Sequence, residues 1–406
     1  MLVTINKSTA KGSVFAPPSK SLAHRYIICA ALAAGKSTIT NVDFSEDIKA
    51  TIDCVRVFGA EVEVCDNTVV VTGVGAKTDK SLLEFPCRES GSTMRFFMGL
   101  AMYFGVASKF YGSETLRKRP FSIYEDLCRD NNIDFIKNED HIFVNGKLSA
   151  GNYEIAGNVS SQFITGLLFM LPLFEKDSKI SLIPPVESRS YLNLTIQAMA
   201  DFGVEVSWMN ENELIIHGGQ HYKNTGDKAF AVEGDYSNAA FLDAFSLIGG
   251  NVEVKGLNEK SLQGDRVYKE YFEALRNSNA CLDISDCPDL GPVLFAMAAA
   301  CEGGVFTGTR RLKMKESDRG EVMCRELAKF CVDSKIEENQ IEIFKSELIA
   351  PNEILNGHND HRIVMSLTLL LTLTGGSLEE AEAVRKSYPG FFEDIKKLGI
   401  ELCCEQ

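Results

Sequence analysis

Residues 202–216, FGVEVSWMNENELII, contain the pattern from which the architecture of the chain can be inferred. Two runs that alternate apolar and polar residues flank a turn rich in Asn and Glu, which predicts a β-hairpin. Before the hairpin, Leu194, Ile196, Met199 and Phe202 follow a helical spacing, which predicts a helix with one buried face. The segment is therefore interpreted as one helix followed by one hairpin.

The same pattern recurs along the chain. A helix-like stretch ends in a short strand at six places, which begin at Phe58, Asn131, Phe202, Ser278, Phe330 and Leu398. Several copies continue into a polar turn and a second apolar run, and such repeats reveal an architecture before any single motif does. Six copies predict an α/β protein with mixed strands, arranged as two domains of three repeats. The alternative is that loose matches arise by chance in any α/β chain.

The composition excludes several classes of protein. The 406 residues carry a formal net charge of −14, which disfavours non-specific binding to nucleic acid or to an anionic membrane. The 12 cysteines form no C-x-x-C pair and the N-terminus has no apolar signal core, so reduced thiols and a cytoplasmic location are expected. The longest apolar stretches are shorter than the roughly 18–20 residues of a membrane-spanning helix.

The segment PPSKSLAHR, residues 17–25, is the first candidate anion site. Ser19 or Ser21 can cap a helix that starts here, which leaves unpaired N–H groups beside Lys20 and Arg25. A helix N-terminus with two cations is suited to bind an anion. The alternative is a capped helix whose cations are simply solvated.

Further segments combine cations with hydroxyl or small residues: 89–95, 116–120, 160–162, 313–319, 360–362 and 386–389. Taken singly, each also has an ordinary interpretation as a loop, a helix cap or a surface salt-bridge ladder. Arg362 is the exception, because it stands at the start of the apolar stretch 363–373. A charge so close to the core must be paired or must bind a ligand.

Other site types are not supported by the sequence. Residues 34–38, AGKST, resemble the end of a phosphate-binding loop, but Ala30 stands where its first glycine is required. The pairs His358/His361 and His217/His221 have marginal metal spacing, and no G-x-S-x-G elbow is present. Neither a metal site nor acyl-enzyme chemistry is expected.

Taken together and in this order, the segments resemble the 5-enolpyruvylshikimate-3-phosphate synthase family, from Pro17 to about Pro389. The resemblance is carried by residues 19–21 with Arg25, 91–95, 119–120, 160–162, 234–237, 263–265, 288–289, 315–319, 360–362 and 386–389. It implies a two-domain inside-out α/β barrel with three βαβαββ repeats in each domain. One domain would combine residues 1–18 with 229–406 and be completed by the N-terminal strand, and the other would span 19–228, with the active site in the cleft between them.

The resemblance also implies the reaction. The 5-hydroxyl of shikimate 3-phosphate attacks C2 of phosphoenolpyruvate while C3 is protonated, and the tetrahedral intermediate then expels phosphate, a step of chorismate and aromatic amino acid biosynthesis. No metal and no organic cofactor are implied, the substrates are the only partners, and a monomer is expected. Two phosphates and two carboxylates must lie together, so several fixed cations are needed to offset their repulsion.

Residue roles follow by position from the same resemblance. Asp289 would be the base on the 5-hydroxyl, and Glu316 or Lys20 the acid toward the methylene carbon. The residues implied to bind phosphoenolpyruvate are Lys20, Gly91, Arg95, Arg119, Gln162, Arg319, Arg362 and Lys386. Those implied to bind shikimate 3-phosphate are Lys20, Ser21, Arg25, Ser160, Ser161, Gln162, Ser188, Tyr191, Asp289, Arg311 and Lys315.

Three residues depart from the family pattern: Pro18 stands where Gly is common, His24 where Asn is common, and Glu89 where Asn usually begins a loop. The Glu89 carboxylate would repel phosphoenolpyruvate, and equally the family's inhibitor glyphosate, unless Arg88, Arg95 or another cation neutralises it. Two other functions stay open. One is the sister enolpyruvyl transferase that acts on UDP-N-acetylglucosamine, and the other is a catalytically silent relative that binds anions.

Overall fold

A computed structural model describes residues 1–226 and 228–405. The chain forms two compact units, one made of Met1–Pro17 with Glu233–Gln406 and the other of Pro18–Val232. The sequence-based division had placed the boundaries after residues 18 and 228. Within the described residues, no helix combines the length and the apolar content that a membrane span requires. The predicted α/β class with mixed strands is confirmed by six small sheets flanked by helices.

The unit Pro18–Val232 contains three four-stranded sheets of one plan, in which a parallel pair continues into an antiparallel hairpin. The strand orders are β14(Ala229–Ala231)-β3(Ala34–Thr40)-β5(Thr68–Val74)-β4(Glu61–Cys65), β6(Leu82–Pro86)-β7(Ala107–Tyr111)-β9(His141–Asn145)-β8(Asp134–Lys137) and β10(Asn152–Ala156)-β11(Ser178–Ile183)-β13(Glu213–Ile216)-β12(Val206–Trp208). The hairpin predicted at residues 202–216 is confirmed, because β12 pairs with β13 from Val206↔Ile216 to Trp208↔Leu214.

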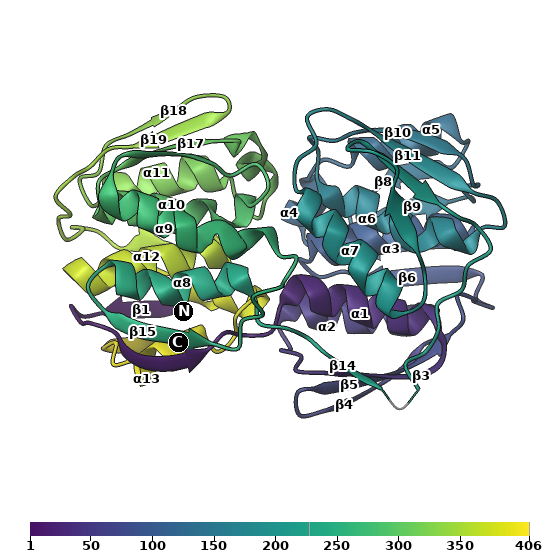
Figure 1. The fold of residues 1–406 in the computed structure, drawn as a ribbon, viewed down its shortest axis with the longest axis horizontal. Coiled ribbons are helices and arrows are strands. Elements are labelled where there is room, and N and C mark those ends of the chain that lie inside the picture. The colour runs from purple at the N-terminus through teal and green to yellow at the C-terminus, as the bar shows by residue number, and fades with distance from the viewer. Residues whose placement is uncertain (227, 406) are drawn as a thin grey trace. The chain divides into compact units, whose positions relative to one another are not determined.

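The helices of this unit are α1(Lys20–Leu32), α2(Glu46–Val57), α3(Gly91–Phe104), α4(Glu114–Lys118), α5(Ser122–Asp130), α6(Ser161–Met170) and α7(Arg189–Asp201), with the 3₁₀ turn η1(Leu171–Leu173). Every residue of α1 from Leu22 to Leu32 is buried, and α3 packs against α6. Figure 1 shows α1 and α2 lying along the sheet of β3, β4, β5 and β14. Helices that are apolar on nearly all sides thus lie inside the unit, as their sequences require.

The other unit has two four-stranded sheets and one pair of strands. The orders are β16(Ala280–Asp283)-β17(Gly304–Thr307)-β19(Gln340–Ile343)-β18(Ser334–Ile336), β20(Leu355–Asn356)-β21(Gly376–Glu379)-β1(Leu2–Ile5)-β22(Leu402–Glu405) and β15(Asn251–Lys255)-β2(Lys11–Phe15). Its helices are α8(Tyr236–Leu247), α9(Tyr268–Asn277), α10(Gly291–Ala300), α11(Arg319–Ala328), α12(His361–Thr374) and α13(Phe391–Lys397). Four 3₁₀ segments join them: η2(Gly264–Val267), η3(Pro288–Leu290), η4(Thr309–Met314) and η5(Ala381–Lys386).

Two repeats of this unit differ from the simple pattern. The strand expected to open a hairpin at Ser278 is β16, which pairs in parallel with β17 and so begins the next repeat. The residues that follow β16 contain no second alternating run and lead directly into η3. The last strand, β22, finds its antiparallel partner in β1, so residues from the start of the chain complete the final repeat.

Candidate active site

Asp289 lies at the centre of a cluster of charged side chains in the unit that contains the C-terminal half of the chain. The short η3 turn carries it, and its carboxylate is 2.9 Å from Lys315 Nζ, 2.8 Å from Arg319 Nη1 and 3.1 Å from Arg362 Nη2. Burial by itself would raise the pKa of Asp289, but the three cations outweigh burial and hold this pKa well below its usual range. Asp289 is therefore ionised here.

Asp360 ties two of these cations to the start of α12. Both of its oxygens accept from Arg319, at 2.8 Å from Nε and 3.2 Å from Nη2. It also caps α12 by accepting from the Arg362 backbone N–H at 3.0 Å. The carboxylate is fully buried. A bidentate ion pair of this kind fixes a guanidinium in orientation as well as in position, so Asp360 sets the direction in which Arg319 presents its charge, whereas it holds only the backbone of Arg362.

Glu316 and His361 form the next part of the cluster. Glu316 Oε2 lies 3.0 Å from His361 Nδ1. Burial would raise the pKa of Glu316, but His361, Lys386 and Arg319 together hold it well below its usual range. Ligand atoms of Glu316, Asp360 and His361 lie within 4.8 Å of one another. A divalent cation there would have to displace Arg319 from Asp360, so this geometry does not favour a metal site.

Lys315 is the cation of the cluster whose charge is easiest to remove. Burial lowers its pKa most, Asp289 opposes this, and Arg319 and Arg311 lower it further, to about 8. Arg311, also predicted as a binding residue, is buried beside it. Four cations of the cluster stand against three carboxylates: Lys315, Arg319, Arg362 and Lys386 against Asp289, Glu316 and Asp360. The excess of positive charge in a buried setting suits an anionic ligand.

In the unit Pro18–Val232, the starts of α3 and α6 bring together three of the residues predicted to bind phosphoenolpyruvate, Gly91, Arg95 and Gln162, and Arg119 reaches them from the end of α4. Arg95 Nη1 donates to Gln162 Oε1, and Gln162 Nε2 donates to Ser92 Oγ at 2.8 Å. The Arg95 guanidinium lies over the ring of Phe163, 4.9 Å from the ring centroid. These contacts hold a buried cation one turn from the N-terminus of α3.

Gly91, the first residue of α3, makes room for two guanidinium groups. A Cβ atom at this position would lie 3.0 Å from Arg119 Nη1 and 3.4 Å from Arg95 Nη1. The Nε of Arg119 is buried and has no hydrogen-bond partner within the described part of the chain. Two cations and an unused donor beside the N-terminus of α3 form a site ready for a phosphate or a carboxylate.

The residues predicted to hold shikimate 3-phosphate in this unit cluster at the starts of α1, α6 and α7. Arg25 is buried, and its guanidinium donates to Thr195 Oγ1 at 2.9 Å and to the backbone carbonyls of Ser21 and Tyr191 at 2.6 and 3.1 Å. Burial lowers the pKa of Arg25 to about 10. Arg25 thus joins α1 to α7 and brings two of its predicted neighbours together.

The remaining predicted residues occupy helix starts. Lys20 opens α1 and its Nζ lies 3.0 Å from Asp47 Oδ2. Ser160 caps α6 by accepting from the backbone N–H of Gln162, and Ser161 is the buried first residue of that helix. Ser188 stands at the cap position of α7 with a left-handed φ of 56°.

Arg88, one of the cations expected to offset Glu89, has two carboxylate partners. It donates to Glu46 at 2.5 Å and to Asp53 at 2.7 Å. These two contacts engage both terminal nitrogens of its guanidinium. Glu89 itself is half-buried and immediately precedes Ser90, the residue that caps α3.

Sequence reasoning missed Asp47 and gave no role to Asp265, Asp360 or His361, although the motifs that contain these three residues carried the resemblance. Asp47 and Asp360 pair with predicted cations that are distant in sequence, and no local pattern marks such partners. Burial and the charge of Asp289 raise the pKa of Asp265 to about 7. The motif at 263–265 marked Asp265 as part of the resemblance without indicating a function.

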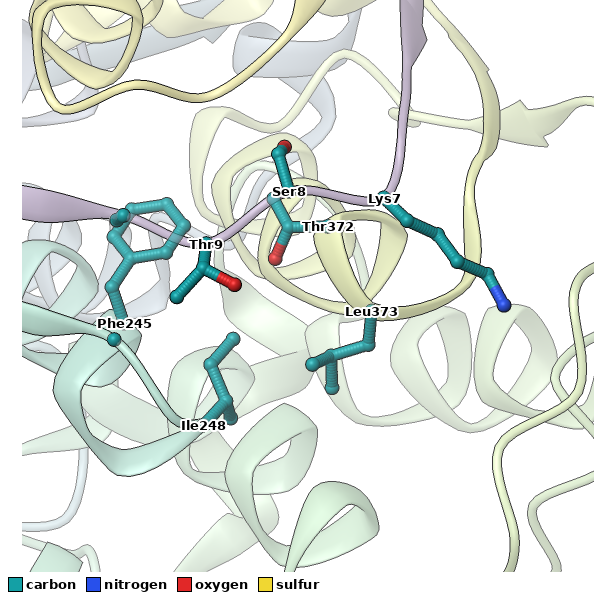
Figure 2. A pocket seen from close by; sticks show the side chains of 9 residues that line it. Lys7, Ser8, Thr9, Phe245, Ile248, Thr372 and Leu373 are labelled. Carbon is teal, nitrogen blue, oxygen red and sulfur yellow. The ribbon is translucent and has the colours of Figure 1, made fainter.

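A cavity of about 280 Å³ lies in the same unit as Asp289, and Figure 2 shows the side chains that line it. It is lined by Lys7, Ser8, Thr9, Ala10, Phe245, Ile248, Gly250, Thr372 and Leu373. Thr372 and Leu373 end α12, whereas Arg362 begins it. At 1.5 Å per helical residue the two ends are roughly 15 Å apart, and no predicted site residue lines this cavity.

Comparison with known proteins places the chain in a family. The family model EPSP synthase (3-phosphoshikimate 1-carboxyvinyltransferase) matches residues 5–395. A 3-phosphoshikimate 1-carboxyvinyltransferase of Clostridium perfringens is 37% identical over 98% of this chain and 98% of its own length. One of Clostridioides difficile is 38% identical over 97% of each chain. In fold, the structure of EPSP synthase from Acinetobacter baumannii has a TM-score of 0.79 at 23% identity and covers 100% of both chains. This chain belongs to the EPSP synthase family.

Proposed function

We propose that this protein transfers the enolpyruvyl group of phosphoenolpyruvate to the 5-hydroxyl of shikimate 3-phosphate and releases phosphate. The observation that carries the proposal is the partly buried carboxylate of Asp289, held by Lys315, Arg319 and Arg362 at 2.8–3.1 Å. A base surrounded by anion-binding cations is what an alcohol needs to attack a phosphorylated, carboxylated substrate. Family membership names the two substrates.

The cations are proposed to exchange partners when the substrates bind. In the free protein they stabilise the charge of Asp289, and a carboxylate with so low a pKa is a weak base. Phosphate and carboxylate groups of the substrates compete for Lys315, Arg319 and Arg362. As these cations turn to the substrates, the pKa of Asp289 rises toward its ordinary value, and Asp289 becomes able to accept the proton of the 5-hydroxyl.

We assign the proton for the methylene carbon to Lys20. Glu316 is ionised, because His361, Lys386 and Arg319 favour its charged form. An ionised carboxylate has no proton to donate, so the role of Glu316 is to stabilise positive charge. Lys20 carries protons on Nζ, where Asp47 orients it. The steps balance without a redox partner: the bond from O5 to C2 forms, C3 gains a proton, and C3 loses a proton again as the bond from C2 to the phosphate oxygen breaks.

The binding roles divide by the position of each side chain. We propose that phosphoenolpyruvate is held by Lys20, Gly91, Arg95, Arg119, Gln162, Arg319, Arg362 and Lys386. We propose that shikimate 3-phosphate is held by Lys20, Ser21, Arg25, Ser160, Ser161, Gln162, Ser188, Tyr191, Asp289, Arg311 and Lys315. All twelve cysteines are free thiols, which supports a reducing compartment, and we propose that the protein works in the cytoplasm as a monomer.

The test is an assay of phosphate release with phosphoenolpyruvate and one acceptor at a time. We expect release with shikimate 3-phosphate and none with UDP-N-acetylglucosamine. Release with the sugar nucleotide alone would assign the protein to the sister reaction. Binding of both substrates without release would identify a silent relative, and either result contradicts the proposal.

A further inference from the structure

His24 is a buried polar residue to which the proposed reaction gives no role. It lies in α1, four residues after Lys20, and only 1% of it is exposed. Burial, and then the charges of Lys20 and Arg25, hold the pKa of His24 well below its ordinary value. The imidazole is therefore neutral and has one N–H donor and one acceptor.

A continuous chain of short hydrogen bonds leads away from this imidazole through three helices. His24 Nδ1 lies 2.7 Å from Thr51 Oγ1 in α2, and Thr51 Oγ1 lies 2.7 Å from Thr93 Oγ1 in α3. Thr93 Oγ1 donates to Ser90 Oγ at 2.8 Å. Ser90 is the cap of α3. Both threonines and Ser90 are completely buried, so water cannot replace a lost partner.

The direction of these bonds follows from the number of hydroxyl protons. The one proton of Thr93 goes to Ser90, so Thr51 must donate to Thr93. Thr51 then has no proton left, and His24 must donate from Nδ1. Nε2 is left as a bare acceptor, and it is indeed a buried atom without a hydrogen-bond partner in the described part of the chain.

We propose that His24 is a positioning residue for phosphoenolpyruvate: through Thr51 and Thr93 it fixes the cap of α3. The first turn of α3 begins at Gly91 and Arg95 follows one turn later, while α1 holds Lys20 and α2 holds Asp47. The chain of hydrogen bonds thereby sets the distance between cations that must meet one small anion. A buried hydroxyl left without its hydrogen-bond partner is destabilising, so its loss of partner would displace or disorder the start of α3.

This inference rests on the proposed function, and Thr51→Val tests it in the middle of the chain of hydrogen bonds. Valine keeps the shape of threonine and removes the hydroxyl, so the KM for phosphoenolpyruvate should rise about fivefold to tenfold while kcat stays within about twofold. His24→Leu should give the same rise, and adding Thr51→Val to it should cause no further change, because one chain is broken only once. His24→Asn places an amide N–H near Nδ1 and should hold KM within about twofold of the wild type.

Tyr222→Phe is the matched control. It removes another buried hydroxyl of the same unit, one that donates to the carbonyl of Phe169, and it should lower the melting temperature without changing KM. Titration calorimetry with phosphoenolpyruvate in the presence of shikimate 3-phosphate measures the affinity independently of turnover. Should His24→Leu not fold, Thr51→Val and His24→Asn suffice for the test.

An unchanged affinity in Thr51→Val, or His24→Asn as weak as His24→Leu, would overturn the positioning role. Failure of the proposed function looks different, because the wild-type protein would then release no phosphate with shikimate 3-phosphate. The inference and the function on which it rests can therefore fail separately.

Discussion

Replacing Asp289 by Asn is expected to abolish turnover and yet to strengthen the binding of phosphate. The side chain keeps its shape but no longer neutralises Lys315, Arg319 and Arg362, whose nitrogens lie 2.9, 2.8 and 3.1 Å from the carboxylate. Loss of the proposed general base lowers kcat by about 100-fold to 10,000-fold, which is about 3–5 kcal/mol in the barrier.

The gain in phosphate affinity follows from the charge of the cluster. Four cations stand against three carboxylates, so neutralising Asp289 raises the positive excess from one charge to two. One additional charge roughly 6 Å from a bound phosphate, at an effective dielectric constant of about 40, contributes about 1.4 kcal/mol, or tenfold in affinity.

Two assays on the full chain check this prediction. The release of phosphate from phosphoenolpyruvate and shikimate 3-phosphate gives kcat, and titration calorimetry with inorganic phosphate gives the affinity. Asp243→Asn is the control, since Asp243 is a partly buried aspartate of the same unit whose partner is Tyr268. A kcat within tenfold of the wild type, or phosphate binding that is unchanged or weaker, would refute the reasoning.

Three further predictions concern single residues. Gly91→Ala brings a Cβ to 3.0 Å from Arg119 Nη1. The resulting strain of about 1 kcal/mol should raise the KM for phosphoenolpyruvate about fivefold in steady-state kinetics. An unchanged KM would mean that Arg119 moves away freely. Because the pKa of Lys315 is about 8, kcat/KM should fall above that pH as the lysine loses the charge that holds phosphate. Lys315→Arg should move this fall to higher pH, because arginine keeps its charge. A pH profile that is flat up to pH 10 would contradict a role of Lys315 in binding phosphate. Glu89→Asn removes a negative charge two residues before Gly91 and should increase the affinity for phosphoenolpyruvate about threefold. The same change should lower the free energy of unfolding by about 0.5 kcal/mol, because a carboxylate near a helix N-terminus is stabilising. An unchanged affinity would show that Glu89 is already neutralised.

Local patterns were sufficient to predict the repeated unit and the starts of α1, α6 and α12. The hairpin at 202–216 depends on neighbouring residues and on one turn, so its alternation alone predicted it. The same is true of Ser19 and Ser160, because a capping side chain bonds to a backbone N–H two or three residues ahead. Residue types at fixed offsets carry this information in the sequence itself.

Partners that are far apart along the chain escaped prediction. Asp360 is 41 residues from Arg319, and Asp47 is 27 residues from Lys20. Only the packing of whole helices brings each pair together. The strand predicted at Ser278 is present as β16, but its parallel pairing with β17 could not be predicted, because an edge strand that pairs in parallel has the same alternation as one that opens a hairpin. The pairing of β1 with β22 joins the two ends of the described chain, and no local signal marks it.

The most direct measurement follows the carbon skeleton of phosphoenolpyruvate labelled with ¹³C at C2 and C3, mixed with the protein and shikimate 3-phosphate and observed by NMR. We expect the spectra to show a new vinyl ether, with C2 bonded to the 5-oxygen of the acceptor, and one phosphate released for each molecule formed. Labelled phosphoenolpyruvate that stays intact, or that is converted only to pyruvate, would contradict it.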